Sequence, residues 1–150
     1  MSRSSDSSSS GHTARDLGLF LIRAMVGTVF VFHGAQKLFG VWGGYGLKGT
    51  AGFFEKVNIP LPYPSAVAAS VTEFFGAILL VLGLAFRPAA AVMAFTMAVA
   101  VWVHSPNGFP APAGFEYPLT LGVVLLGLAL IGPGRWAMGQ MFAGKRRRPE

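Results

Sequence analysis

The sequence predicts an all-α, polytopic membrane protein: a bundle of four transmembrane helices with a short amphipathic helix in the first outer loop. Hydrophobic residues make up 53% of the 150 residues and charged residues only 12%, about half the charged fraction of a typical soluble domain. Four apolar stretches follow one another along the chain, separated by polar or turn-forming residues. Backbone groups in lipid must be paired within the chain, so we expect these stretches to be helices.

The two earlier spans are long enough to cross a bilayer and the two later ones are shorter. The predicted spans cover residues 17–39, 65–86, 88–104 and 117–131. At helical rise they reach roughly 33 Å for the first two and roughly 24 Å for the last two, against a hydrocarbon core of about 30 Å. The connection through Arg87, with Pro88 at the start of the third span, is so short that the second and third spans are predicted to form an antiparallel hairpin.

The first outer loop, residues 40–64, has two parts. Its first ten residues hold five glycines, and Thr50 is expected to cap a short amphipathic helix that ends at Val57. Three prolines between residues 59 and 64 then favour an extended polyproline path into the second span. We expect this loop to lie in the outer interface as a lid.

One membrane domain, residues 17–134, is flanked by two tails. Residues 1–16 are rich in serine and are expected to be a disordered cytoplasmic tail. The sequence Gly132–Gly134 ends the fourth span, and residues 135–150 form a basic cytoplasmic tail.

Charge and cysteine content exclude several functions. Much of the net charge of +6 comes from Lys145–Arg148, which on a hydrophobic chain indicates topology and contact with anionic lipid rather than nucleic acid. The sequence has no cysteine, so the chain by itself forms no disulfide, thiolate metal site or iron–sulfur cluster. The expected partner is the lipid bilayer.

The positions of lysine and arginine predict the orientation. With both termini in the cytoplasm, nine basic residues lie on or near the inner side and three lysines lie outside, as the positive-inside rule requires. Arg23, Arg87 and Arg135 belong to the inner set and are assigned structural or topological roles. Arg23 is expected to reach the inner interface with its long side chain.

Ionisable residues within the spans mark a candidate site. A charge at bilayer depth costs about 2.5–3.5 kcal/mol and usually faces a partner or a cavity. His33 and Glu73 fall at matching depth on neighbouring spans, and Lys37 follows His33 by one helical turn. We therefore predict a ligand pocket open to the outer side, formed by His33, Gln36, Lys37, Glu73, His104, Asn107, Glu116 and Tyr117.

The same residues leave a structural alternative open. Glu73 could form an ion pair with His33 or Lys37 that only joins two helices, and His104 and Glu116 could only cap helices. No metal site is predicted and no catalytic residue is assigned. Close helix packing is expected at six glycines, which are Gly27, Gly34, Gly76, Gly83, Gly122 and Gly127.

Four motifs in order resemble the DoxX family of small four-span membrane proteins. They are Phe32–Gly40 (FHGAQKLFG), Gly52–Phe54, Glu73–Gly76 and His104–Phe109, the last followed by Glu116 and Tyr117. The resemblance runs from about Leu17 to Gly134. It implies a multi-pass protein of a bacterial inner membrane. The family takes its name from association with a quinone-linked sulfur-oxidation complex, but it shares no catalytic motif, so the resemblance implies no particular reaction.

Two functions stay open. In the first, the chain is an accessory subunit that binds partner proteins of a redox or stress-related membrane assembly. Its outer pocket then holds quinone or another small hydrophobic ligand, and the chain can also form an oligomer. In the second, it is a membrane oxidoreductase that binds haem or a metal through His33 and His104. The unequal depths of the two histidines count against the second.

Overall fold

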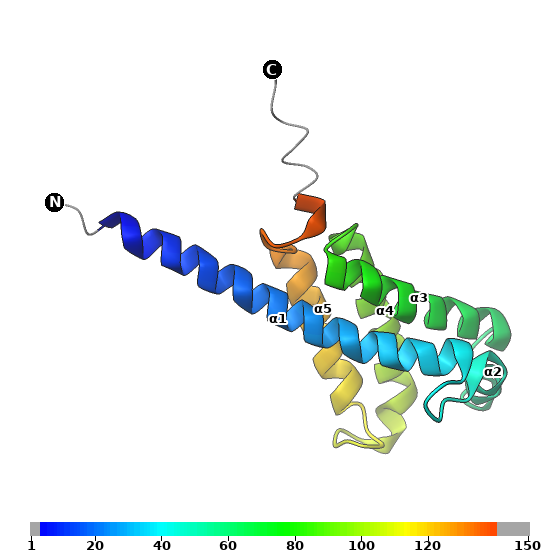
Figure 1. The fold of residues 1–150 in the computed structure, drawn as a ribbon. Helices are drawn as coiled ribbons and strands as arrows, with labels where there is room; N and C mark the ends of the chain where they lie inside the picture. Colours follow the sequence, from blue (N-terminus) through cyan, green and yellow to red (C-terminus); the bar gives the residue numbers. More distant parts are fainter. Residues whose placement is uncertain (1–3, 141–150) are drawn as a thin grey trace.

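The computed structural model describes residues 4–140. Outside the described residues lie residues 1–3 of the first predicted tail and residues 141–150 of the second, which include the basic run Lys145–Arg148. Five α-helices and one 3₁₀ helix follow in order (Figure 1): α1 (Ser4–Phe39), α2 (Gly46–Lys56), α3 (Pro62–Leu82), α4 (Phe86–His104), η1 (Ser105–Asn107) and α5 (Glu116–Ile131). No strand occurs within residues 4–140. The predicted all-helical fold is confirmed.

Three helices are long and apolar enough to cross a membrane, namely α1, α3 and α4, and α5 is a shorter apolar helix. Many large apolar side chains on these helices face outward, with Phe95 70% exposed and Leu130 79% exposed. Such side chains suit contact with lipid, since a soluble monomer rarely exposes contiguous apolar surface on this scale.

The first helix begins earlier than the sequence predicts. The serine-rich segment within residues 1–16 was expected to be disordered, whereas α1 starts at Ser4. Figure 1 shows this part of α1 projecting beyond the bundle without a neighbouring helix. The segment holds no proline, and adding residues to an existing helix avoids the cost of nucleation.

Glycines bring α1 against α3. A Cβ at Gly34 would lie 2.6 Å from the backbone nitrogen of Phe74, and one at Gly27 would overlap the side chain of Val81. Small residues at such contacts let helix backbones approach in lipid. Close packing is also found at Gly76 and Gly122. It is absent at Gly127, where a Cβ would meet nothing within 4 Å, so that one prediction was wrong.

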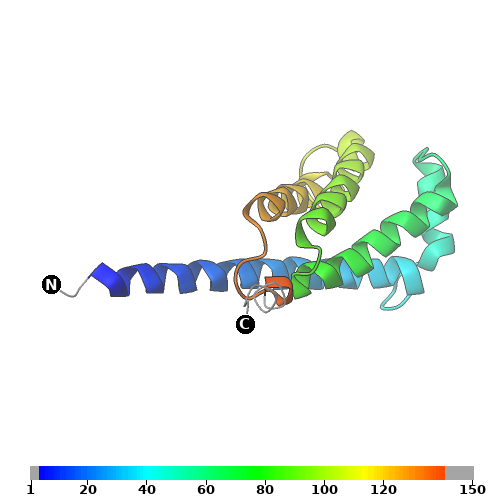
Figure 2. The same ribbon diagram turned by 90° about the horizontal axis from the view of Figure 1, so that it is seen from above.

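The core lies where the α1–α3 pair meets the α4–α5 pair. Fully buried side chains from all four helices meet there, including Phe30, Leu80, Met93 and Leu125. Figure 2 shows the two pairs diverging from the α3–α4 turn toward the end that carries α2. We call the end of the bundle that carries α2 the α2 end.

The helix boundaries around the turns differ from the predicted spans. The second span was predicted to continue to residue 86, but α3 ends at Leu82 because Gly83 takes a left-handed conformation with φ +69° and caps it. The third span was predicted to begin at Pro88, but α4 begins at Phe86. The expected extended path through residue 64 is also shorter, since Pro62 occupies the first turn of α3, where proline is favoured.

The predicted cap at Thr50 is wrong. The helix α2 begins at Gly46, four residues before Thr50, and the Thr50 hydroxyl donates to the carbonyl of Gly46 at 2.8 Å. Threonine satisfies its hydroxyl in this way inside helices. The amphipathic helix itself is present, and it packs against α3 and α1.

At the opposite end of the bundle, Arg23 binds the segment that follows α5. Its guanidinium donates to the carbonyl of Pro133 at 2.7 Å and to that of Trp136, and the residue is only 2% exposed. The guanidinium is therefore covered by the protein rather than exposed at its surface. The break after α5 frees backbone carbonyls that need donors. Asp16 completes the contact by accepting from the backbone N–H of Arg135 at 3.0 Å.

Candidate functional site

Glu73 is the most deeply buried acidic group of the bundle. It lies in the middle of α3, is 1% exposed, and accepts a hydrogen bond from Lys37 of α1 with Nζ 2.5 Å from Oε1. Its second oxygen, Oε2, is buried and has no hydrogen-bond partner among the described residues. Buried polar atoms are almost always paired, so this oxygen needs an explanation.

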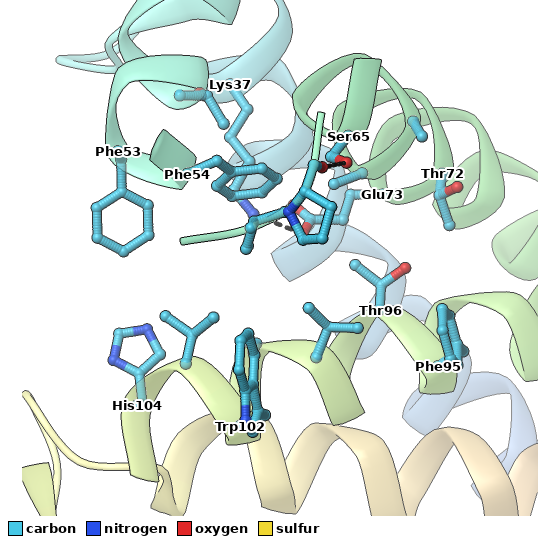
Figure 3. A pocket seen from close by; sticks show the side chains of 18 of the residues that line it. Lys37, Phe53, Phe54, Ser65, Thr72, Glu73, Phe95, Thr96, Trp102 and His104 are labelled. Carbon is cyan, nitrogen blue, oxygen red and sulfur yellow. Dashed lines mark hydrogen bonds and ion pairs between the residues drawn. The ribbon is translucent and has the colours of Figure 1, made fainter. Parts of the chain in front are cut away.

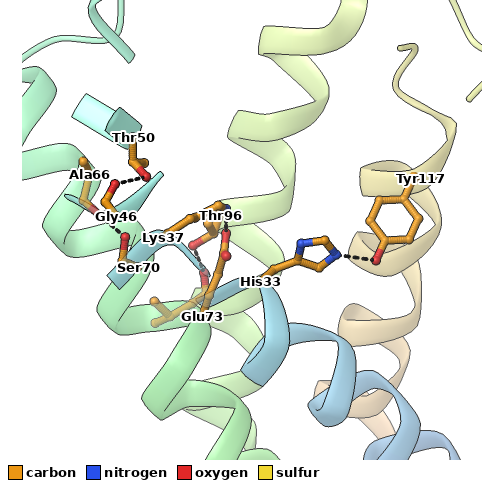
Figure 4. Close-up of polar contacts among 10 residues, drawn as sticks. His33, Lys37, Gly46, Thr50, Ala66, Ser70, Glu73, Thr96 and Tyr117 are labelled. Atoms are coloured by element: carbon orange, nitrogen blue, oxygen red, sulfur yellow. Dashed lines mark hydrogen bonds and ion pairs between the residues drawn. The ribbon is translucent and has the colours of Figure 1, made fainter. Parts of the chain in front are cut away.

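His33 lies beside the ion pair but contacts a different helix. Its Nε2 faces the hydroxyl of Tyr117 on α5 at 3.4 Å, and Figure 4 shows the His33 ring turned toward Tyr117 while Lys37 reaches Glu73. Of the two predicted partners for Glu73, the structure therefore selects Lys37.

A large cavity lies between α2 and α3 on one side and α4 on the other (Figure 3). Its volume is 840 Å³, within the range of roughly 300–1,000 Å³ common for small-molecule sites. Its charged or ionisable groups come from Lys37, Tyr45, Glu73 and His104. Its apolar wall consists mainly of side chains from the three helices, among them Phe53, Phe54, Ile59, Ala69, Phe95, Val99 and Trp102.

A smaller cavity of 210 Å³ lies on the far side of the ion pair. It is lined by His33 and Tyr117 together with Lys37, Glu73 and His104, and the last three also line the large cavity. The ion pair thus borders both cavities. Five of the eight predicted pocket residues are brought together at these walls.

The other three predicted pocket residues hold loops. Gln36 donates to the carbonyl of Trp42 at 3.0 Å, Asn107 donates to that of Ala113 at 3.1 Å, and Glu116 accepts from the backbone N–H of Ala111 at 3.0 Å. None of the three lines either cavity. Their side chains stabilise the loops at the α2 end.

Sequence reasoning missed most of the cavity wall. Thr72 and Thr96 line the large cavity, and Figure 3 shows them on α3 and α4 on its two sides. Thr72 directly precedes Glu73, and a hydroxyl residue beside a buried carboxylate was a usable signal. The phenylalanines of α2 carried no comparable signal, because an apolar helix face suits lipid as well as a cavity.

The two histidines considered for haem or a metal each use one ring nitrogen in a contact. His104 has its Nδ1 3.1 Å from the carbonyl of Ala113, and His33 is engaged with Tyr117. The cavity that both histidines line, 210 Å³, is below the usual range for ligand pockets. Within the described residues, no group of three histidine, aspartate or glutamate residues could hold a metal ion.

Comparisons with known proteins agree on one family. The DoxX family model matches residues 18–106. The putative oxidoreductase CatD of Bacillus subtilis is 31% identical, over 87% of this chain and 92% of its own. The inner membrane protein YphA of Escherichia coli is 30% identical, over 81% and 87%. A membrane protein of Mycobacterium tuberculosis, Rv3486, is 30% identical, over 88% and 85%. No solved structure matches the chain significantly.

Proposed function

The chain belongs to the DoxX family, and on this premise we propose that it is an inner-membrane subunit that binds a small apolar molecule from the bilayer. The ligand occupies the large cavity between α2, α3 and α4. The chain acts as an accessory subunit of a redox or stress-related membrane assembly, and other proteins of that assembly carry the chemistry.

The observation that carries this proposal is an apolar cavity with a buried ion pair in its wall. An ion pair that only joined two helices would need no cavity of 840 Å³ beside it. The cavity is open on the side of the exposed Phe95 and Trp102, so lipid or a ligand has to cover its apolar wall. A few polar groups in an apolar pocket are the usual arrangement of a small-molecule site.

A quinone, in its oxidised or its reduced quinol form, is one ligand that fits this description. It is an apolar redox carrier dissolved in the bilayer, and the relative CatD carries the name of a putative oxidoreductase. Phe95 and Trp102 of α4 line the cavity and are also exposed on the outside of the bundle. This arrangement favours entry of the ligand from the lipid side. With both termini in the cytoplasm, as the charge bias indicates, the α2 end and the cavity lie in the outer half of the membrane.

Filling the cavity tests the proposal. Ala69 lines the large cavity, whereas Ala98 on α4 is exposed and lines neither cavity. Both variants, Ala69→Phe and Ala98→Phe, are purified from gently solubilised membranes beside the wild type, and co-purifying lipids, quinones and proteins are identified by mass spectrometry. We expect a small molecule that is depleted in Ala69→Phe and retained in Ala98→Phe. Equal amounts in all three proteins would contradict the proposal.

A further inference from the structure

The unpaired oxygen of Glu73 places a chemical requirement on the ligand. Beside the ammonium group of Lys37, Glu73 is a carboxylate, which accepts hydrogen bonds and cannot donate them. One of its oxygens is already bound to Lys37, and the other has no donor within the described part of the chain. A donor for Oε2 therefore has to come from a molecule in one of the two cavities that Glu73 lines.

Four other polar groups of the large cavity already donate to backbone carbonyls, among them the hydroxyls of Thr50 and Ser65. The Thr96 hydroxyl donates to the carbonyl of Val92 at 3.2 Å, and the Nδ1 of His104 faces the carbonyl of Ala113, which can only accept. Toward the cavity the Thr96 hydroxyl can then only accept, and the other ring nitrogen of His104 can accept when it carries no proton. Lys37 has protons to donate, but it can donate to a hydroxyl, an ether or a carbonyl alike, so it does not discriminate among them.

Oε2 is covered in this conformation, and Lys37 is the neighbour that is free to move. The Lys37 side chain is 33% exposed while that of Glu73 is 1% exposed, and lysine has a flexible four-carbon stem. A ligand group reaches Oε2 only if the Lys37 side chain moves aside while it keeps its contact with Oε1.

We propose that the cavity selects apolar molecules that carry a hydroxyl group, and that Glu73 Oε2 is the acceptor that makes this selection. The inference rests on the proposed function and narrows it to one ligand chemistry, the hydroxyl-bearing or reduced member of a pair such as phenol and ether or quinol and quinone. Sites that hydrogen-bond a hydroxyl reject an analogue without it, because the buried partner would then stay unpaired.

A matched pair of probes tests this selection on the full chain in lipid nanodiscs. 2-Naphthol and 2-methoxynaphthalene share an apolar body and an oxygen that can accept from Lys37, but only naphthol can donate. Binding is measured by equilibrium dialysis, with protein-free nanodiscs as the blank for partition into lipid. We expect naphthol to bind about tenfold more tightly, or better, the usual effect of one unpaired buried acceptor.

A double variant assigns the selection to Glu73. Replacing both members of a buried ion pair by apolar residues of similar size is often tolerated, so Lys37→Met/Glu73→Met should keep the cavity and bind both probes equally. A naphthol preference that survives in this variant overturns the role of Glu73. If the variant is not recovered folded, the wild-type comparison still decides the selection.

The remaining outcomes separate this inference from the proposed function. Equal binding of both probes to the wild type, lost in Ala69→Phe, overturns the hydroxyl selection and leaves the proposed function standing. Absence of both probes above the blank, including the case in which a second copy of the chain fills the cavity, overturns both.

Discussion

Lys37 of α1 and Glu73 of α3 form an ion pair across the first two long helices, although Glu73 is 1% exposed and Lys37 33% exposed. The pair lies at the boundary between the packed core of the bundle and the large cavity. Toward the α3–α4 turn, buried side chains such as Phe30 and Met93 fill the core, and toward the α2 end the large cavity takes its place. The pair thus joins α1 to α3 at the edge of a cavity and at the same time supplies its polar wall.

The first prediction concerns the energy of this pair. Glu73→Met alone leaves the ammonium group of Lys37 without its partner, so it should lower the free energy of unfolding more than Lys37→Met/Glu73→Met does. The coupling energy between the two sites should be about 1–2 kcal/mol, the usual size for polar contacts between helices in membranes. Unfolding in bicelles for the wild type, both single variants and the double variant gives this number.

The exposed Lys48 of α2 provides the control for that cycle. Lys48→Met combined with Glu73→Met should be additive, since sites without a shared contact rarely couple. Additive effects for Lys37 and Glu73 as well would mean that the two side chains do not interact in the membrane.

The second prediction concerns the contact between α1 and α3. Gly34→Ala should destabilise the fold by about 1–3 kcal/mol, the common cost of overpacking, because the new Cβ would lie 2.6 Å from the backbone of Phe74. Gly127→Ala should be neutral or slightly stabilising, since nothing lies within 4 Å of its Cβ position. Thermal unfolding of both variants in the same detergent compares them. Equal losses of stability would argue against the close approach at Gly34.

The third prediction concerns the segment after α5. Arg23→Met keeps most of the side-chain volume but removes the donors to the carbonyls of Pro133 and Trp136. Hydrogen bonds from a charged donor contribute about 1.5–3 kcal/mol. The fraction of molecules in which the segment after α5 is detached should therefore rise at least about tenfold. Trypsin cleavage after the exposed Arg135 should accelerate accordingly, as followed by the mass of the product. Arg15→Met, which removes an exposed arginine of the same helix, should leave the rate unchanged.

The four apolar helices could be predicted because helix formation in lipid depends mainly on local hydropathy. The partner of Glu73 was also within reach, since matching depth on adjacent helices limits it to His33 or Lys37. The helix boundaries at Gly83 and Thr50 could not be predicted, because they depend on which backbone groups meet at a turn rather than on composition.

The large cavity could not be predicted from any single segment. Its wall joins Phe54 of α2, Thr72 of α3 and Trp102 of α4, residues that are far apart in sequence. The two helix pairs diverge toward the α2 end (Figure 2), which leaves space between them. The polar pocket predicted from ionisable residues therefore overlapped the cavity at Lys37, Glu73 and His104, while its apolar wall was missed.

The last prediction concerns orientation in the membrane, which follows from the nine-to-three distribution of basic residues. Because the chain has no native cysteine, single cysteines can be placed at two exposed positions, Glu55 of α2 and Gln140 after α5, without altering that distribution. An impermeant maleimide applied to intact cells should label Glu55→Cys and spare Gln140→Cys, and both should react after the membrane is opened. Labelling of Gln140→Cys alone in intact cells would reverse the orientation and move the α2 end, with its cavity, to the cytoplasmic side.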